Sequence, residues 1–201
     1  MIDAIVLAAG FGTRMGRVKP LVPVDGRPAL CVVLERLQGA SIDRPIVVLG
    51  HAAEEIKAAI DLTDARIVTN PDPARGLASS LCLGLAAVDV DAIGALVLHA
   101  DMPSVAVATI AAVAAAAEEG ASIAAPTYRG SRGFPVFFRQ SHFAELRRTL
   151  AGDIGAKDYL RLRTKELRLV EVDDPGCLVD VDRPEDLRRM ADRRRSCATS
   201  A

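Results

Sequence analysis

Residues 7–21 read LAAGFGTRMGRVKPL, and this stretch is the most informative part of the sequence. It begins at the end of a short apolar run, residues 4–7, which has the pattern of a buried strand. The loop that follows contains three glycines, Gly10, Gly12 and Gly16. Because glycine has no Cβ atom, the backbone N–H groups of such a loop can approach an anion closely. The stretch therefore predicts a first strand that leads into a phosphate-binding loop.

Two cations in the same stretch, Arg14 and Lys19, favour a triphosphate as the anion. Arg14 can donate hydrogen bonds to two phosphate oxygens, and Lys19 supplies a point charge. A triphosphate needs this charge balance before a nucleophile can attack it. A Walker loop is not indicated, because Pro20 follows Lys19, and the glycine spacing does not fit the dinucleotide fingerprint. The alternative is a tight strand-to-helix turn that carries surface charges.

The rest of the chain alternates short β-branched runs with helical stretches, which predicts an α/β fold with a mainly parallel sheet. The expected strands are residues 4–7, 46–49, 66–68, 95–98 and 122–125. The expected helices between them are residues 29–39, 53–60, 77–88 and 105–119. After residue 126 we expect a strand at 133–138, helices at 141–150 and 156–162, a strand at 167–172 and a last helix at 185–194.

Composition and charge narrow the class of protein. Half of the 201 residues are apolar, which fits one domain with a sizeable core. The net charge of -1 gives no electrostatic support for a nucleic-acid partner. The cysteines lack CxxC spacing, so neither a zinc site nor a disulfide framework is indicated. No apolar run is long enough to span a membrane, and the N-terminus reads as a strand rather than a signal peptide. We expect a cytoplasmic protein with one domain at residues 1–195 and a flexible tail at 196–201.

A second informative segment, residues 70–81, reads NPDPARGLASSL and leads into an expected helix. Gly76, Ser79 and Ser80 lie near the N-terminus of that helix, where amides and hydroxyls can bind a base or a ribose. The alternative is that the serines cap the helix within a proline-rich loop.

Two segments of the sequence carry carboxylates that are candidate metal ligands. Asp101 comes just after the expected strand 95–98, and in open α/β sheets ligands bind beyond the carboxyl ends of the strands. A carboxylate there suits Mg²⁺, although it can instead cap the next helix. Asp180 and Asp182 alternate along an extended segment, so they share a face and can meet one cation.

These segments resemble the signature motifs of the nucleotidyltransferases that include molybdenum cofactor cytidylyltransferases, molybdenum cofactor guanylyltransferases and sugar-phosphate nucleotidyltransferases. The ending Lys19-Pro20-Leu21 is closer to the cytidylyltransferase branch. The resemblance implies a Rossmann-like three-layer αβα sandwich with a mainly parallel central sheet, like that of nucleotide-diphospho-sugar transferases. It also implies transfer of CMP from CTP to a phosphorylated acceptor, with release of pyrophosphate.

The resemblance also implies roles for individual residues. It assigns catalysis to Arg14, Lys19 and Asp101. It assigns Mg²⁺, with Mn²⁺ as a substitute, to Asp101 together with Asp182 or Asp180, and Asp182 is narrowly favoured. The implied nucleotide-binding residues are Leu7, Ala8, Ala9, Gly10, Gly12, Thr13, Arg14, Lys19, Pro20, Asn70, Gly76, Ser79 and Ser80.

Phe134 departs from the family pattern, because a histidine is expected at this place beside the acceptor. The resemblance implies molybdopterin, a phosphorylated pterin, as the acceptor, and a molybdenum hydroxylase or its maturation chaperone as a protein partner. Phe134 leaves the identity of the acceptor open. GTP in place of CTP and a sugar phosphate as acceptor are alternatives. An NADPH-dependent oxidoreductase on the same scaffold, as in a homologous pigment-reducing branch, and a nucleotide-binding regulator without catalysis are alternatives of other classes.

Overall fold

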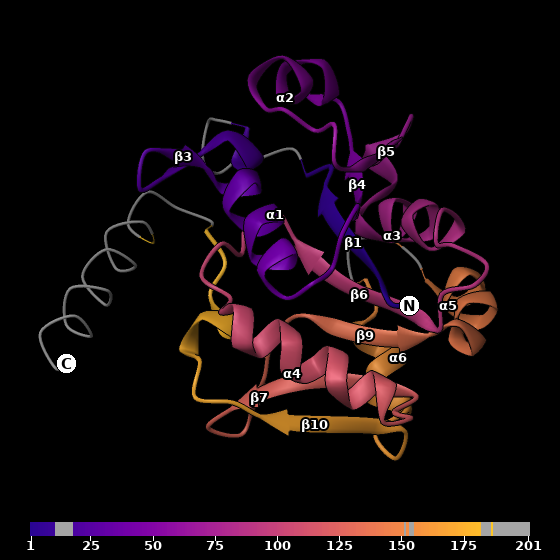
Figure 1. Cartoon of the computed structure of the whole chain (residues 1–201). Coiled ribbons are helices and arrows are strands. Elements are labelled where there is room, and N and C mark those ends of the chain that lie inside the picture. The colour runs from indigo at the N-terminus through magenta and orange to yellow at the C-terminus, as the bar shows by residue number, and fades with distance from the viewer. Residues whose placement is uncertain (11–17, 151, 153–154, 182–185, 187–201) are drawn as a thin grey trace, which may run out of the picture.

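The fold is built on one eight-stranded sheet with helices on both faces (Figure 1). The computed structural model describes residues 1–10, 18–150, 152, 155–181 and 186. The strands of the sheet are β1 (Asp3–Ala8), β4 (Ile46–Leu49), β5 (Arg66–Thr69), β6 (Gly94–His99), β7 (Ile123–Tyr128), β8 (Ser131–Arg132), β9 (Val136–Arg139) and β10 (Leu167–Glu171). The α-helices among the described residues are α1 (Ala29–Gly39), α2 (Ala53–Ala59), α3 (Leu77–Ala86), α4 (Val107–Glu118), α5 (Phe143–Thr149) and α6 (Lys157–Leu162).

The sheet is mainly parallel, as the alternation of strands and helices predicts. Its strand order is β10-β7-β9-β6-β1-β4-β5, and β8 pairs with β7. Strands β4, β1 and β6 are parallel neighbours, β5 is parallel to β4, and β10 is parallel to β7. Strand β9 runs antiparallel between β6 and β7. The carboxyl ends of β1, β4 and β6 therefore meet at one edge, where both the glycine loop and Asp101 follow.

Alternating residues of β1 divide the core into two layers. Ala4 and Val6 pack with apolar side chains of α1 and α4 on one face of the sheet. Ile5 and Leu7 pack with side chains of α3, α5 and α6 on the other. Successive side chains of a strand point to opposite faces, so a central strand that is apolar throughout is buried on both. The predicted three-layer αβα sandwich is confirmed.

Several element boundaries differ from those predicted. The helix expected at 77–88 ends at Ala86, and the helix expected at 105–119 spans Val107–Glu118. The strand expected at 133–138 begins only at Val136, after Pro135, which has no N–H to donate to a neighbouring strand. The last helix, expected at 185–194, lies outside the described residues.

Four short helical turns and one hairpin complete the described chain. The turns are η1 (Lys19–Leu21), η2 (Pro73–Arg75), η3 (Gln140–His142) and η4 (Pro175–Leu178). Strands β2 (Pro23–Val24) and β3 (Arg27–Pro28) form the hairpin around Asp25 and Gly26, both of which have positive φ. Asp-Gly is a preferred pair for such a turn. Within the described residues, no helix is both long and apolar enough to cross a membrane.

Candidate active site

Lys19 and Asp101 form the centre of the candidate site. Lys19 begins η1, and Asp101 lies two residues beyond the end of β6. Lys19 Nζ donates a hydrogen bond to Asp101 Oδ2 at 3.1 Å, although 82 residues separate them in the sequence. The two side chains are 21% and 18% exposed. The sequence analysis identified this lysine and this aspartate separately. In the structure their side chains are in contact, and both are still partly accessible to a ligand.

The segment that carries Asp180 runs beside Asp101. The backbone N–H of Val181 donates to the Asp101 carbonyl oxygen at 2.8 Å. Asp180 and Asp101 both line one cavity. Two carboxylates at the mouth of the same cavity are a donor set that suits Mg²⁺ or Mn²⁺, both of which prefer oxygen ligands. The other residue expected at the metal, Asp182, lies outside the described residues.

Asp101 does not cap the next helix, because Asp174 does so instead. Asp174 Oδ2 accepts hydrogen bonds from Ala106 N at 2.9 Å and from Thr109 Oγ1 at 2.7 Å, at the start of α4. Its other oxygen accepts from Gly176 N at 2.8 Å. Asp174 therefore anchors η4, and the segment that leads on toward Asp180, to the first turn of α4. The capping alternative for Asp101 is wrong, and its carboxylate remains directed at Lys19.

His99 is a further residue of this region, which the sequence analysis did not single out. It is the last residue of β6, it lines the cavity beside Asp101, and its ring meets the edge of Phe134 with the centroids 4.8 Å apart. Burial lowers the pKa of His99 from 6.5, while the carboxylates of Asp101 and Asp180 oppose that shift. The imidazole is therefore neutral near pH 7. Its position two residues before Asp101 was the sequence signal that could have identified it.

The start of the glycine loop is fixed by close packing at the sheet edge. Leu7 and Ala8 belong to β1, and Leu7 lines the cavity. A Cβ atom on Gly50 would lie only 2.6 Å from the carbonyl oxygen of Ala9, so a larger residue would displace the backbone there. Gly10 follows in an exposed position. Pro20 is buried in η1. The remaining expected loop residues, Gly12, Thr13 and Arg14, lie outside the described residues.

Asn70, Ser79 and Ser80 form a hydrogen-bonded group at the start of α3. The buried Asn70 donates through Nδ2 to Ser79 Oγ at 2.8 Å and to Ser80 Oγ at 2.9 Å. Gly76, with φ of 89°, makes the turn into the helix, and Ser79 Oγ donates to its carbonyl oxygen. No side chain caps this helix, so the capping alternative for the serines is not what the structure has. The group lies beyond β5, along the same edge of the sheet as Ala9 and Asp101.

A cavity of about 400 Å³ opens beside Asp101 and Asp180. Arg132 and Lys157 contribute cationic side chains to its lining, and Cys177 contributes a thiol. Burial raises the pKa of the Cys177 thiol to about 11, so the thiol is uncharged near pH 7. Its apolar lining includes Leu81, Val97, Phe134, Val136, Phe138 and Leu160. The cavity therefore combines charged and apolar side chains in one lining.

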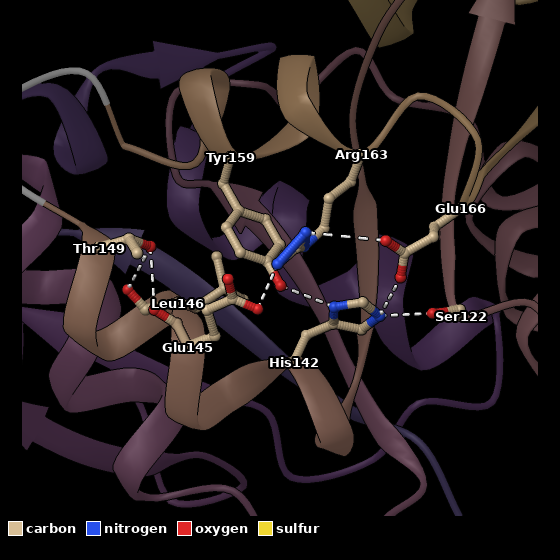
Figure 2. Close-up of polar contacts among 8 residues, drawn as sticks. All are labelled: Ser122, His142, Glu145, Leu146, Thr149, Tyr159, Arg163 and Glu166. Carbon is tan, nitrogen blue, oxygen red and sulfur yellow. Dashed lines mark hydrogen bonds and ion pairs between the residues drawn. The ribbon is translucent and has the colours of Figure 1, made fainter.

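A second polar cluster contacts helix α6 (Figure 2). The buried His142 lies with Nδ1 2.7 Å from the hydroxyl oxygen of Tyr159, and its Nε2 is hydrogen-bonded to Ser122. Arg163 lies over the Tyr159 ring, 4.4 Å from its centroid, and pairs with Glu145. Because α6 carries both Tyr159 and the cavity-lining Leu160, this cluster holds one wall of the cavity in place.

A mostly parallel sheet between two helical layers, with a glycine-rich sequence after the first strand, is a Rossmann-like fold. Residues 4–170 match the MobA-like NTP transferase domain, and the chain belongs to this family.

Relatives of known name or structure agree with this assignment. Nicotine blue oxidoreductase of Paenarthrobacter nicotinovorans is 29% identical over 197 residues, which are 94% of this chain and 96% of that protein. Rv0371c of Mycobacterium tuberculosis has a solved structure with a TM-score of 0.85 and 34% identity, covering 94% of this chain and 96% of that one. Its complex with manganese has a TM-score of 0.81 at 32% identity, covering 94% and 97%.

A nucleotidyl transferase from Methanothermobacter has a TM-score of 0.80 at 28% identity, covering 96% of this chain and 97% of that one. Other relatives match over shorter stretches. The chain spans 26% of the length of a bifunctional GlmU protein of Cupriavidus necator.

Proposed function

We propose that this chain transfers CMP from CTP to a phosphorylated acceptor in a reaction that depends on Mg²⁺ or Mn²⁺. The contact between Lys19 and Asp101 carries the proposal. It joins a cation that can bind the triphosphate to a carboxylate that can bind the metal, next to the glycine loop. The motif resemblance implies molybdopterin as the acceptor, with a molybdenum hydroxylase or its maturation chaperone to receive the product, but Phe134 in place of the expected histidine leaves the acceptor open.

In the proposed reaction a phosphate oxygen of the acceptor attacks the α-phosphorus of CTP. A new oxygen–phosphorus bond forms, the bond from the α-phosphorus to the bridging oxygen breaks, and pyrophosphate leaves. The acceptor phosphate is anionic near pH 7, so no general base is needed. The chain then contributes positioning and charge balance. Lys19 and Arg14 would hold the phosphates, and the group around Asn70 would hold the base and ribose.

A metal at this place would be held by Asp101 together with Asp180 or Asp182. When bound, it would neutralise negative charge on the phosphates. The manganese complex of Rv0371c supports divalent-metal binding in a relative of the same fold.

Calorimetry with CTP, GTP, ATP, UTP and NADPH, each with and without Mg²⁺, tests the proposal. CTP should bind most tightly, and only when Mg²⁺ is present. Asp101→Asn, which removes the carboxylate charge at nearly constant size, should weaken binding of the CTP–metal complex. Asp91→Asn is a control on the exposed surface, where the Asp91 side chain lies away from the cavity. The proposal would be contradicted if CTP bound equally well without Mg²⁺ and if Asp101→Asn left that binding unchanged.

A second candidate function is NADPH-dependent reduction of an aromatic substrate. It is favoured by the match to nicotine blue oxidoreductase along 94% of the chain. Hydride transfer needs no metal at Asp101, so the same titrations separate the two functions. Binding of NADPH without Mg²⁺, together with no preference among the nucleoside triphosphates, would favour the oxidoreductase.

A further inference from the structure

The lining of the cavity bears on the kind of acceptor that the chain can use. Asp101 and Asp180 line the cavity together with residues of α3, α6 and the strands β6 and β9. Of the expected nucleotide-binding residues that the structure describes, Leu7 lines the cavity, whereas Lys19, Asn70 and the serines of α3 do not. The cavity therefore adjoins the expected nucleotide region and can receive the partner of the nucleotide.

Apolar side chains from separate elements converge on this space. Val97 of β6, Phe138 of β9 and Leu160 of α6 are each less than 5% exposed and line the cavity. An acceptor that buries hydroxyl groups against such side chains loses hydrogen bonds to water, at about 1–3 kcal/mol for each unpaired group. An apolar or aryl surface gains about 25 cal/mol for each Å² that it buries.

Phe134 is one of the apolar side chains that line the cavity. Its backbone N–H donates to the Cys177 carbonyl oxygen at 2.9 Å, and its ring meets His99 edge to face. A Cβ atom on the preceding Gly133 would lie 2.6 Å from Cys177 Sγ, so only glycine allows this close approach. The backbone of Phe134 is therefore held against η4, and its ring packs against His99. The ring presents an aromatic surface to the cavity where a histidine would present a hydrogen-bonding group.

Arg132 and Lys157 are placed to bind an anionic group of the acceptor. Both cations line the same cavity, Arg132 on β8 and Lys157 at the start of α6. Cations beside an apolar space suit a ligand that has an anionic group and an apolar body. A phosphate monoester of an aromatic or other apolar alcohol has this combination.

We propose that the acceptor is a phosphate monoester with an apolar or aryl body, and that Phe134 determines this specificity. The inference rests on the proposed transfer reaction and narrows its acceptor. It sets such acceptors apart from sugar phosphates, whose hydroxyls would be buried. It also sets them apart from phosphorylated pterins, whose ring edges carry hydrogen-bonding groups.

The test compares three probes on the full chain in the presence of Mg²⁺ and a CTP analogue whose α,β-bridging oxygen is replaced by a methylene group, so that no transfer occurs: 1-naphthyl phosphate, glucose 1-phosphate and a phosphorylated pterin. Calorimetry should give 1-naphthyl phosphate a Kd at least about tenfold below those of the other two. Phe134→His should raise the Kd of 1-naphthyl phosphate about tenfold, whereas Phe134→Leu, which keeps an apolar side chain, should raise it much less. Leu162→Ala is the matched control, because Leu162 lies on α6 but is 85% exposed.

The outcomes separate this inference from the proposed function. If CTP binds with Mg²⁺ but the naphthyl ester has no advantage, or if Phe134→His and Phe134→Leu behave alike, the apolar-acceptor inference is wrong and the transfer reaction stands. If CTP does not bind, the transfer reaction fails and the assignment of an acceptor fails with it. Tighter binding of the sugar phosphate or of the pterin would also overturn the inference and identify the acceptor class directly.

Discussion

Single side chains in this protein connect segments that are far apart in the sequence. Lys19 and Asp101 are the clearest case, since one hydrogen bond joins the end of the glycine loop to the end of β6. The Lys19–Asp101 pair is partly shielded from water. A bound phosphate would replace Asp101 as the partner of Lys19, and a bound metal would replace Lys19 as the partner of Asp101. Each charge would therefore still have an opposite charge beside it.

Replacement of Lys19 tests its role at the triphosphate. Lys19→Ala should raise the Kd for CTP with Mg²⁺ about 10- to 100-fold, because a hydrogen bond to a charged group contributes about 1.5–3 kcal/mol. Calorimetry measures the change. Lys57→Ala is the control, since Lys57 forms an exposed ion pair with Glu54 on α2. An unchanged Kd for Lys19→Ala would remove this lysine from the nucleotide site.

At the scale of elements, two polar groups hold helices in place around the cavity. Asp174 joins η4 to the first turn of α4, and the cluster around His142 joins α5, α6 and the segment before β7. Neither has a local sequence signature, because each depends on residues that only the fold brings together.

Asp174→Asn should destabilise the protein by about 1–3 kcal/mol, because the amide nitrogen cannot accept the hydrogen bonds that one carboxylate oxygen now accepts. Urea unfolding followed by circular dichroism measures the change. Asp61→Asn is a matched control, since Asp61 accepts hydrogen bonds from Thr63 in a similar turn on the surface. Its unfolding midpoint should stay close to that of the original protein. Equal midpoints for the two variants would show that Asp174 does not anchor η4.

The cluster in Figure 2 predicts a pH dependence of stability. Burial lowers the pKa of His142 from 6.5, an effect that Glu166 opposes and Arg163 reinforces. The unfolded chain therefore binds a proton at His142 first as the pH falls. Stability should fall as the pH drops from 6.5 to the lowered pKa of the folded state, and should not depend on His142 above that range.

Urea unfolding between pH 5 and 8 measures this effect as the difference in slope between the original protein and His142→Gln. The subtraction cancels contributions of other groups that both proteins share, including His99. NMR titration of the His142 ring in the folded protein gives a second readout. A folded-state pKa at or above 6.5, or equal slopes for the two proteins, would contradict the prediction.

At the scale of the whole molecule, the local sequence pattern predicted the architecture but not every contact between side chains. The strand at 46–49 and the helix at 29–39 have the predicted bounds, because their apolar periodicity coincides with burial. The meeting of Lys19 and Asp101 could also be anticipated, since both follow the carboxyl ends of strands in one parallel sheet. The two-residue hairpin strands at 23–24 and 27–28 were too short to have a periodicity.

The parts that were missed are those that depend on packing between distant elements. Asp174 had no capping motif of its own, because the helix that it caps begins far earlier in the chain. His99 was not selected, since sequence alone does not show which strand end faces a cavity. The same limit applies to Phe134. The motif showed that a phenylalanine stands where a histidine is expected, but only the structure shows that it lines a cavity with Val97, Phe138 and Leu160.

The backbone bond from Val181 to Asp101 has a consequence for the order in which the site is assembled. Asp180 follows β10, the last strand of the sheet among the described residues. During synthesis, a chain that has emerged only as far as β10 has these strands but lacks Asp180, and it also lacks the buried Cys177 and Val181. The candidate metal site would therefore gain its second carboxylate only after translation has passed residue 180.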